Sequence, residues 1–108
     1  MMPPPGYMKV GTAPISVTDI RLAKQEVDIL DAAPEGSKPL GEIYVVRCHQ
    51  NQFEDEPTEE MVQDDLLIEA LAKGANAVTD ITISKRGDAR WNCWYLLEGK
   101  AQGFVLPK

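Results

Sequence analysis

The sequence predicts a small α+β domain, a mostly antiparallel sheet with one packed helix in the order β-β-α-β-β-β. Three observations lead to this fold class. The length of 108 residues fits one domain. Several short segments are rich in β-branched and aromatic residues, as strands are. Only residues 58–73 combine apolar residues at helical spacing with helix-capping signals, which predicts a single helix.

The first 25 residues are predicted to form an extended arm or tail, ahead of a single domain at residues 26–108. Four prolines and two glycines stand among the first fourteen residues, and proline fixes φ and removes a backbone donor. The first strand is predicted at residues 27–30. Residues 31–39 collect Pro, Gly and Ser and are expected to form a loop.

The second strand and the helix have the clearest local signals. "GEIYVVRC", residues 41–48, is typical of a strand, and a polar connection follows it. The helix is predicted from Thr58 to Lys73, with Thr58 or Asp55 as its cap and Gly74 as a left-handed stop. Apolar residues occur on more than one side of this helix. We therefore expect the N-terminal arm or another chain to cover it.

Three strands are predicted after the helix. They lie at residues 75–84, 90–98 and 101–106. A turn at "KRGD", residues 85–88, separates the first two, and a tight turn around Gly99 separates the last two. Strands joined by such short turns pair antiparallel.

Composition and charge exclude several function classes. Acidic residues outnumber basic ones by 17 to 11, giving a net charge of −6, so the phosphates of nucleic acid and anionic membrane surfaces would repel the chain. No run of eighteen apolar residues predicts a membrane-spanning helix, so no direct membrane insertion is expected. The first residues lack the charged and apolar regions of a signal peptide. A cytoplasmic protein and a trimmed mature domain both remain open.

No catalytic or metal-binding pattern stands out. His49 is the only histidine, and its neighbour Cys48 points to the opposite face if both lie on a strand. We therefore do not expect Cys48 and His49 to act as a catalytic nucleophile and its base. For the same reason we do not expect them to bind a metal together with Cys93, and the C-x-x-C spacing typical of zinc sites is absent. The acidic residues between 54 and 65 lack calcium-loop spacing. We expect no enzyme activity, no cofactor and no metal.

The two cysteines lie on different predicted strands. Strand alternation puts each of them on a side interpreted as core-facing: Cys48 with Tyr44 and Val46, and Cys93 with Trp91, Tyr95 and Leu97. A bond between them would close a loop that stabilises the fold by roughly 4 kcal/mol. Two buried free thiols acting as small apolar side chains are the alternative.

Several motifs in this order resemble the RcsF-like domain of envelope-stress sensor lipoproteins. The resemblance covers residues 27–106 and rests on "LGEIYVVRCHQ", the helix, "ANAV", a strand with a cysteine and "GKAQGFVL". Its most telling residues are Leu40, Gly41, Glu42, Cys48, Gln50, Ala75, Asn76, Ala77, Val78 and Cys93. It implies a disulfide between Cys48 and Cys93. The family has a second disulfide, near whose positions this chain carries Ile83 and Glu98.

The resemblance implies a non-enzymatic sensor or interaction domain of the cell envelope that contacts protein partners. A trimmed mature domain would then be periplasmic or anchored to the outer membrane, with the lipidated cysteine upstream. The "GANAV" segment is also similar to the YbjQ-like family, so the alternative is a small cytoplasmic oligomer that binds a ligand or metal. Whether the chain forms a homo-oligomer stays open.

The expected partner surface consists of Trp94, Arg47 and His49. Alternation puts Trp94 on the face opposite Cys93, and Arg47 and His49 on the face opposite Cys48. If the cysteines point toward the helix, these three residues lie together on the uncovered face of the sheet. Exposed aromatic and Arg residues carry most of the energy of protein interfaces.

Overall fold

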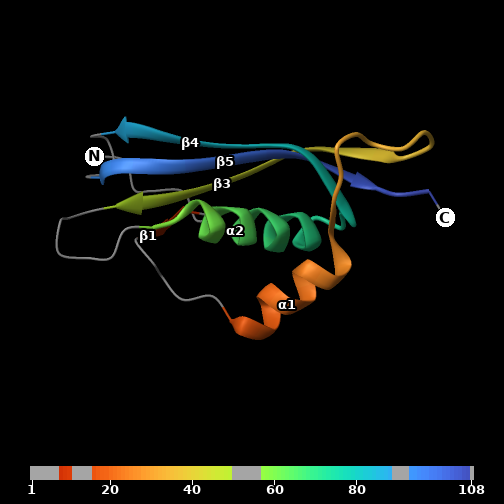
Figure 1. The fold of residues 1–108 in the computed structure, drawn as a ribbon, viewed down its shortest axis with the longest axis horizontal. Coiled ribbons are helices and arrows are strands. Elements are labelled where there is room, and N and C mark those ends of the chain that lie inside the picture. The colour runs from red at the N-terminus through yellow and green to blue at the C-terminus, as the bar shows by residue number, and fades with distance from the viewer. Residues whose placement is uncertain (1–7, 11–15, 50–56, 89–92, 108) are drawn as a thin grey trace.

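The structure is a five-stranded sheet with two helices on one side (Figure 1). It is a computed structural model that describes residues 8–10, 16–49, 57–88 and 93–107. In chain order the elements are β1 (Met8–Val10), α1 (Val17–Glu26), β2 (Asp28–Ile29), β3 (Lys38–His49), α2 (Glu59–Ala72), β4 (Ala77–Asp88) and β5 (Cys93–Val105). The α+β class predicted from the sequence is confirmed.

Long antiparallel strands form the centre of the sheet, and short parallel strands lie at its edges. The spatial order is β1-β3-β5-β4-β2, with β5 antiparallel to both β3 and β4. At one edge β1 runs parallel to β3, and at the other β2 runs parallel to β4. The sheet is therefore mixed, with an antiparallel centre as expected.

Helix α2 begins and ends where the sequence predicts. The Thr58 hydroxyl accepts a hydrogen bond from the Met61 amide at 3.2 Å, which caps the first turn. At the other end Gly74 has a φ of +89°, and the Gly74 and Ala75 amides bond the carbonyls of Leu71 and Ala70. This pair of bonds is the Schellman motif, which satisfies carbonyls at the end of the helix.

Helix α1 corrects the expected extended arm. Residues 17–26 are helical, and Ser16 caps them by accepting from the Asp19 amide at 3.4 Å. Ala23 and Val27 are buried in the same core as α2, and Lys24 pairs with Asp64 at 3.5 Å. The domain thus begins before residue 26. Helix α1 covers α2 on the side away from the sheet (Figure 1). The sequence predicted that either the N-terminal segment or another chain would cover this helix.

Two predicted turns are instead parts of long strands. "KRGD" forms the last residues of β4, and Gly99 lies in the middle of β5. A Cβ atom at Gly99 would lie 2.6 Å from Val62 Cγ1 and 3.1 Å from Leu66 Cδ1. Gly99 therefore lets α2 approach β5 closely and makes no turn. The observed order is β-α-β-β-α-β-β. It has two helices where one was predicted, and the single strand β5 takes the place of the two strands predicted at residues 90–98 and 101–106.

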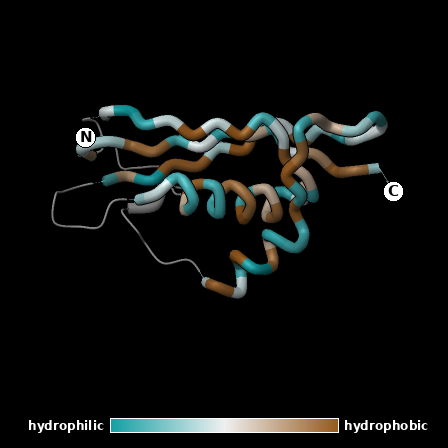
Figure 2. The backbone as a smooth tube through the Cα atoms, in the orientation of Figure 1, coloured by the Kyte–Doolittle hydropathy of each residue, from teal (hydrophilic) through white to brown (hydrophobic). Residues whose placement is uncertain are grey.

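The buried apolar residues form two clusters. Figure 2 shows hydrophobic stretches along the central parts of the strands and in α2 beneath them. The helix-side cluster lies between the helices and the sheet and comprises Ala23, Val27, Ile43, Val45, Val62, Leu66, Leu67, Ala70, Ala75, Val78, Leu97 and Ala101. The disulfide-side cluster comprises Val46, Cys48, Cys93 and Leu96, with Tyr44 packed against it.

Candidate functional site

The two cysteines meet where β3 ends and β5 begins. Cys48 and Cys93 form a disulfide with their Cα atoms 5.5 Å apart, and their exposures are 1% and 7%. The expected bond is therefore confirmed, and the chain has no free cysteine.

A bulge in β5 brings Cys93 to the face of Cys48. Arg86 and Asp88 of β4 pair with Leu96 and Cys93 of β5, so β5 uses one more residue than β4 over the same stretch. An extra residue in one strand locally interrupts the alternation of faces. Cys93 thereby lies on the face of Leu96 and Cys48, although simple alternation from Leu97 would put it on the other face.

The structure corrects the predicted face of Cys48. Val45 lies opposite Gly99, where α2 packs, so alternation in β3 turns Ile43, Val45, Arg47 and His49 toward the helix side. Tyr44, Val46 and Cys48 face away from α2. The pairing of the cysteines was thus predicted correctly, but not the side of the sheet on which they bond.

Trp94 lies at the bulge and is exposed. Its side chain is 58% exposed, while its neighbours Cys93 and Leu96 are buried. The Trp94 ring contacts the His49 ring edge-on, with centroids 5.9 Å apart and planes at 79°. Bulges commonly re-aim a side chain at functional sites. Trp94 is therefore an outward-facing aromatic group on a constrained stretch of strand.

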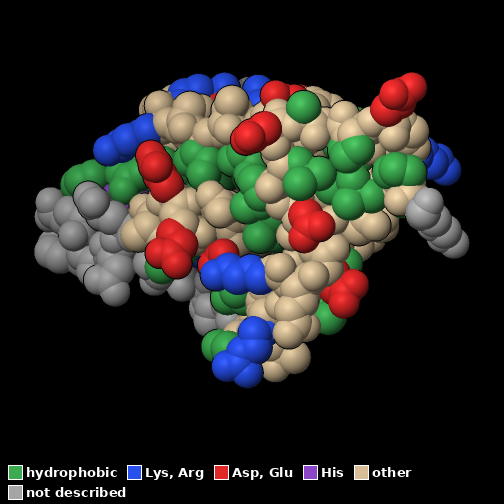
Figure 3. Space-filling view, turned by 45° about the vertical axis from the view of Figure 1, so that its right-hand side comes forward, with side chains coloured by type: hydrophobic (Ala, Val, Ile, Leu, Met, Phe, Trp, Pro, Cys, Tyr) green, Lys and Arg blue, Asp and Glu red, His purple; other side chains and the backbone are tan. Residues whose placement is uncertain are grey.

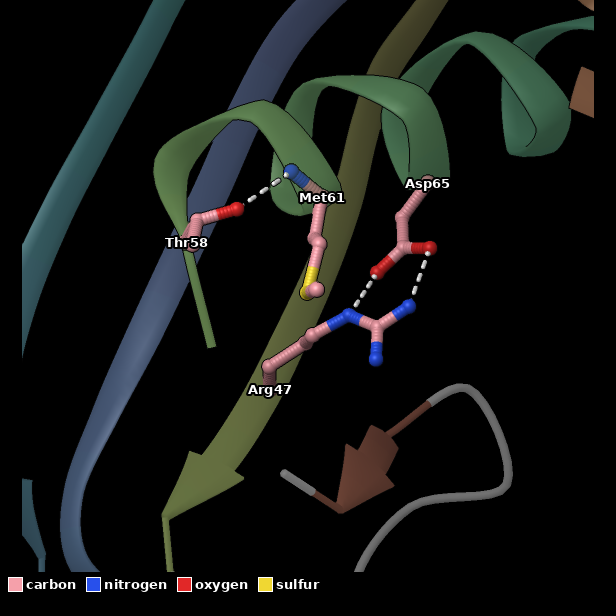
Figure 4. Close-up of polar contacts among 4 residues, drawn as sticks. All are labelled: Arg47, Thr58, Met61 and Asp65. Atoms are coloured by element: carbon pink, nitrogen blue, oxygen red, sulfur yellow. Dashed lines mark hydrogen bonds and ion pairs between the residues drawn. The ribbon is translucent and has the colours of Figure 1, made fainter. Parts of the chain in front are cut away.

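Arg47 does not reach the surface, contrary to the expected partner surface. It is 1% exposed and points toward α2, where its Nε and Nη2 atoms donate to Asp65 Oδ2 and Oδ1 at 2.8 and 3.0 Å (Figure 4). Two parallel bonds of this kind fix both groups in one geometry. Arg47 thus links β3 to α2 in the interior.

His49 is likewise buried, with 3% exposure. Its ring stacks on Tyr95 at 4.9 Å with an angle of 25° between the planes, and Lys85 Nζ lies 4.0 Å from the Tyr95 centroid. The Nδ1 atom of His49 has no hydrogen-bond partner within the described part of the chain. His49 therefore packs against the Trp94 ring and is too buried to be part of the expected partner surface.

A polar cluster on the face away from α2 was missed by the sequence analysis. Tyr44 donates to Glu98 Oε2 through its hydroxyl, and Arg86 Nη2 lies 3.3 Å from the same oxygen. Glu98 is 8% exposed, and Lys100 Nζ lies 5.9 Å from the Tyr44 centroid. The alternation of side chains along the two strands could have indicated this cluster, because Tyr44 and Glu98 occupy the same face of neighbouring strands.

The described residues offer no arrangement typical of catalysis. They contain no group of three or more His, Cys, Asp or Glu that could hold a metal ion. Both cysteines are oxidised, and Cys48 and His49 point to opposite faces of β3. None of the described helices is long and apolar enough to cross a membrane. Trp91, expected beside Cys93, lies outside the described residues.

No protein-family model matches the chain, and no curated protein matches it either.

Proposed function

We propose that the chain is a non-enzymatic interaction domain of the cell envelope that binds a protein partner through Trp94. The observation that carries this proposal is the 58% exposure of Trp94 on a bulge next to the disulfide. Tryptophan is enriched among the residues that dominate interface energies. The proposed role agrees with the resemblance to the RcsF-like sensors, which are expected to act through protein contacts.

The surroundings of Trp94 favour binding because they restrict its motion in the free protein. Cys93 is covalently tied to β3, and His49 packs against the Trp94 ring while stacking on Tyr95. A side chain already held in place loses less conformational entropy when a partner binds. Each of these neighbours is itself buried or half-buried, so the support comes from the folded core.

The disulfide supports a location in an oxidising compartment, such as the periplasm. Disulfides persist there, whereas cytosolic proteins mostly keep their thiols reduced. The alternative of a cytoplasmic YbjQ-like oligomer has less support, since it goes with reduced cysteines. Mass spectrometry of the protein isolated from its native cells, with and without reductant, tests the compartment. A fully reduced pair in freshly alkylated cells would contradict an envelope location.

Substitution of Trp94 tests the contact itself. The wild-type domain is first used to capture and identify a partner from native envelope extracts, and its affinity is then measured with purified components. Trp94→Ala is expected to weaken that affinity by about 2 kcal/mol or more, roughly thirtyfold. Leu22→Ala is the matched control, because Leu22 is 46% exposed on α1, away from the bulge.

Equal binding by wild type and Trp94→Ala would refute the proposed contact. Equal weakening by Leu22→Ala would show a general effect of surface apolarity instead. Thermal unfolding of both variants checks that the comparison concerns folded protein.

A further inference from the structure

The disulfide lies directly beside the exposed tryptophan on both of the strands that it joins. Cys48 and Cys93 are bonded, and the residues that follow them, His49 and Trp94, contact each other through their rings, with centroids 5.9 Å apart. The bond and the ring contact thus connect β3 to β5 at successive positions. A change in the bond therefore acts first on the two residues whose rings meet.

The start of β5 has little backbone pairing. Among the described residues, the ladder between β3 and β5 ends at the pair of His49 and Tyr95, so it does not reach Trp94 or Cys93. Within the same residues, the ladder on the other side of β5 pairs Cys93 with Asp88, at the very end of β4 and beyond the bulge. The ends of strands open at a low cost in free energy. The covalent bond is therefore the strongest tie between β3 and the start of β5.

The position of Cys48 is fixed from both sides. Cys48 pairs with Val10 of β1 and with Leu96 of β5, and it is 1% exposed. Cys93 is the more exposed of the two cysteines, at 7%. The disulfide therefore holds the sparsely paired start of β5 to a strand that is paired along both edges.

We propose that the bond between Cys48 and Cys93 is a redox-sensitive switch that controls the order of the Trp94 site, an inference that rests on the proposed function of Trp94. While the bond is intact, Trp94 is held against His49 and is ready to bind. When a dithiol reductant breaks the bond, the start of β5 separates from β3. The partner must then order Trp94 on binding, which lowers the affinity.

The switch operates by thiol–disulfide exchange. A thiolate of the dithiol attacks the sulfur of Cys93, the more exposed cysteine, so the S–S bond breaks and Cys48 leaves as a thiolate. The second thiol of the reductant then displaces Cys93 from the mixed disulfide. The reductant ends as a disulfide, and the protein has gained two electrons and two protons as two thiols.

The rest of the domain is expected to stay folded when the bond is reduced. The helix-side cluster has twelve buried residues and contains neither cysteine. Figure 3 shows hydrophobic side chains gathered across the middle of the molecule, above helix α1. The disulfide-side cluster has four buried residues, and both cysteines are among them. Reduction should therefore loosen the smaller region first, as a local switch requires.

Nuclear magnetic relaxation of backbone amides tests the switch without a partner. In the oxidised protein, the order parameters of Trp94 and Ala101 should both be about 0.85, as in a rigid backbone. In dithiothreitol the value for Trp94 should fall below about 0.6, whereas Ala101, in the helix-side cluster, should keep its value. Cys48→Ala with Cys93→Ala should give a mobile Trp94 with or without the reductant.

Three results would overturn the proposal. The first is an unchanged order parameter at Trp94 after reduction. The second is a loss of order at Ala101 as well, because the bond would then hold the whole fold together. The third is a response of the alanine pair to dithiothreitol, because the reductant would then act without the bond. If the alanine pair does not fold, the oxidised and reduced wild type decide.

The affinity for the partner captured with the wild-type domain connects the switch to the proposed function. Reduction of the wild type, or the alanine pair, should weaken binding about fivefold, the cost of ordering one side chain. Adding the alanine pair to Trp94→Ala should cause no further loss. Equal affinity of the oxidised and reduced wild type would overturn the proposal. Equal binding by wild type and Trp94→Ala would refute the proposed function alone, and the order parameters would still decide whether the bond controls Trp94.

Discussion

The two buried clusters of this domain are held together in different ways. The helix-side cluster joins twelve buried residues from both helices and from β3, β4 and β5, whereas the disulfide-side cluster has four. The first has enough apolar area to stabilise itself by burial. The second is small, and a covalent bond joins its two strands. The cross-link therefore lies in the smaller of the two clusters, beside the exposed Trp94.

The helix-side region also contains a buried ion pair between Arg47 and Asp65. The side chains are 1% and 3% exposed. A buried pair contributes little net stability relative to apolar residues, but removal of one partner leaves an uncompensated charge. Substitutions in the helix-side region are therefore expected to destabilise the fold by leaving a charge buried, and those in the disulfide-side region by removing the cross-link.

The largest effect is expected for Asp65→Ala. It should lower the free energy of unfolding by about 3–5 kcal/mol, because Arg47 would stay buried without its carboxylate. Asp64→Ala is the control, since Asp64 pairs with the half-exposed Lys24 and should cost about 1 kcal/mol or less. Urea denaturation measures both. Similar losses for the two variants would show that the buried pair has no special role.

The next largest effect is expected when the disulfide is removed. Cys48→Ala with Cys93→Ala should cost about 4 kcal/mol, because the sequence separation of 45 closes a long loop in the unfolded chain. Hydrogen exchange should show lost protection at Leu96 before Ala101, which belongs to the helix-side cluster. Uniform loss of protection along β5 would mean that the two clusters unfold as one unit.

A smaller effect is expected for Gly99→Ala. The added methyl would overlap Val62 and push α2 from β5, which should cost about 1–3 kcal/mol. Gly87→Ala is the matched control, because a Cβ atom there meets nothing within 4 Å and should change stability by about 0.5 kcal/mol or less. Thermal unfolding distinguishes them. A neutral Gly99→Ala would show that α2 shifts without cost.

The smallest effect on stability is expected for Trp94→Ala. A side chain that is 58% exposed should change the free energy of unfolding by about 0.5 kcal/mol or less when it is truncated. The same urea denaturation measures it. A loss above about 2 kcal/mol would show that the His49 and Trp94 rings stabilise the fold substantially, and the partner role would then need a less disruptive variant.

Local signals in the sequence determined the elements that form independently of distant residues. Helix α2 has its cap at Thr58 and its stop at Gly74 within the segment itself, so both ends were predictable. Helix α1 was missed although Ser16 and Asp19 carry a capping signal, because Val17, Thr18 and Ile20 also suit a strand. Burial of Ala23 and Val27 beside α2 resolves that ambiguity in the folded chain.

Contacts between distant segments determine which face of the sheet each residue occupies. Alternation shows that Arg47 and His49 share a side of β3, but either side suits the sequence, and the position of α2 selects the buried one. The straight run of β5 through Gly99 depends on Val62 and Leu66 of α2. The bulge that exposes Trp94 depends on pairing with β4. These features arise from contacts between distant segments, which a period of two along one strand does not encode.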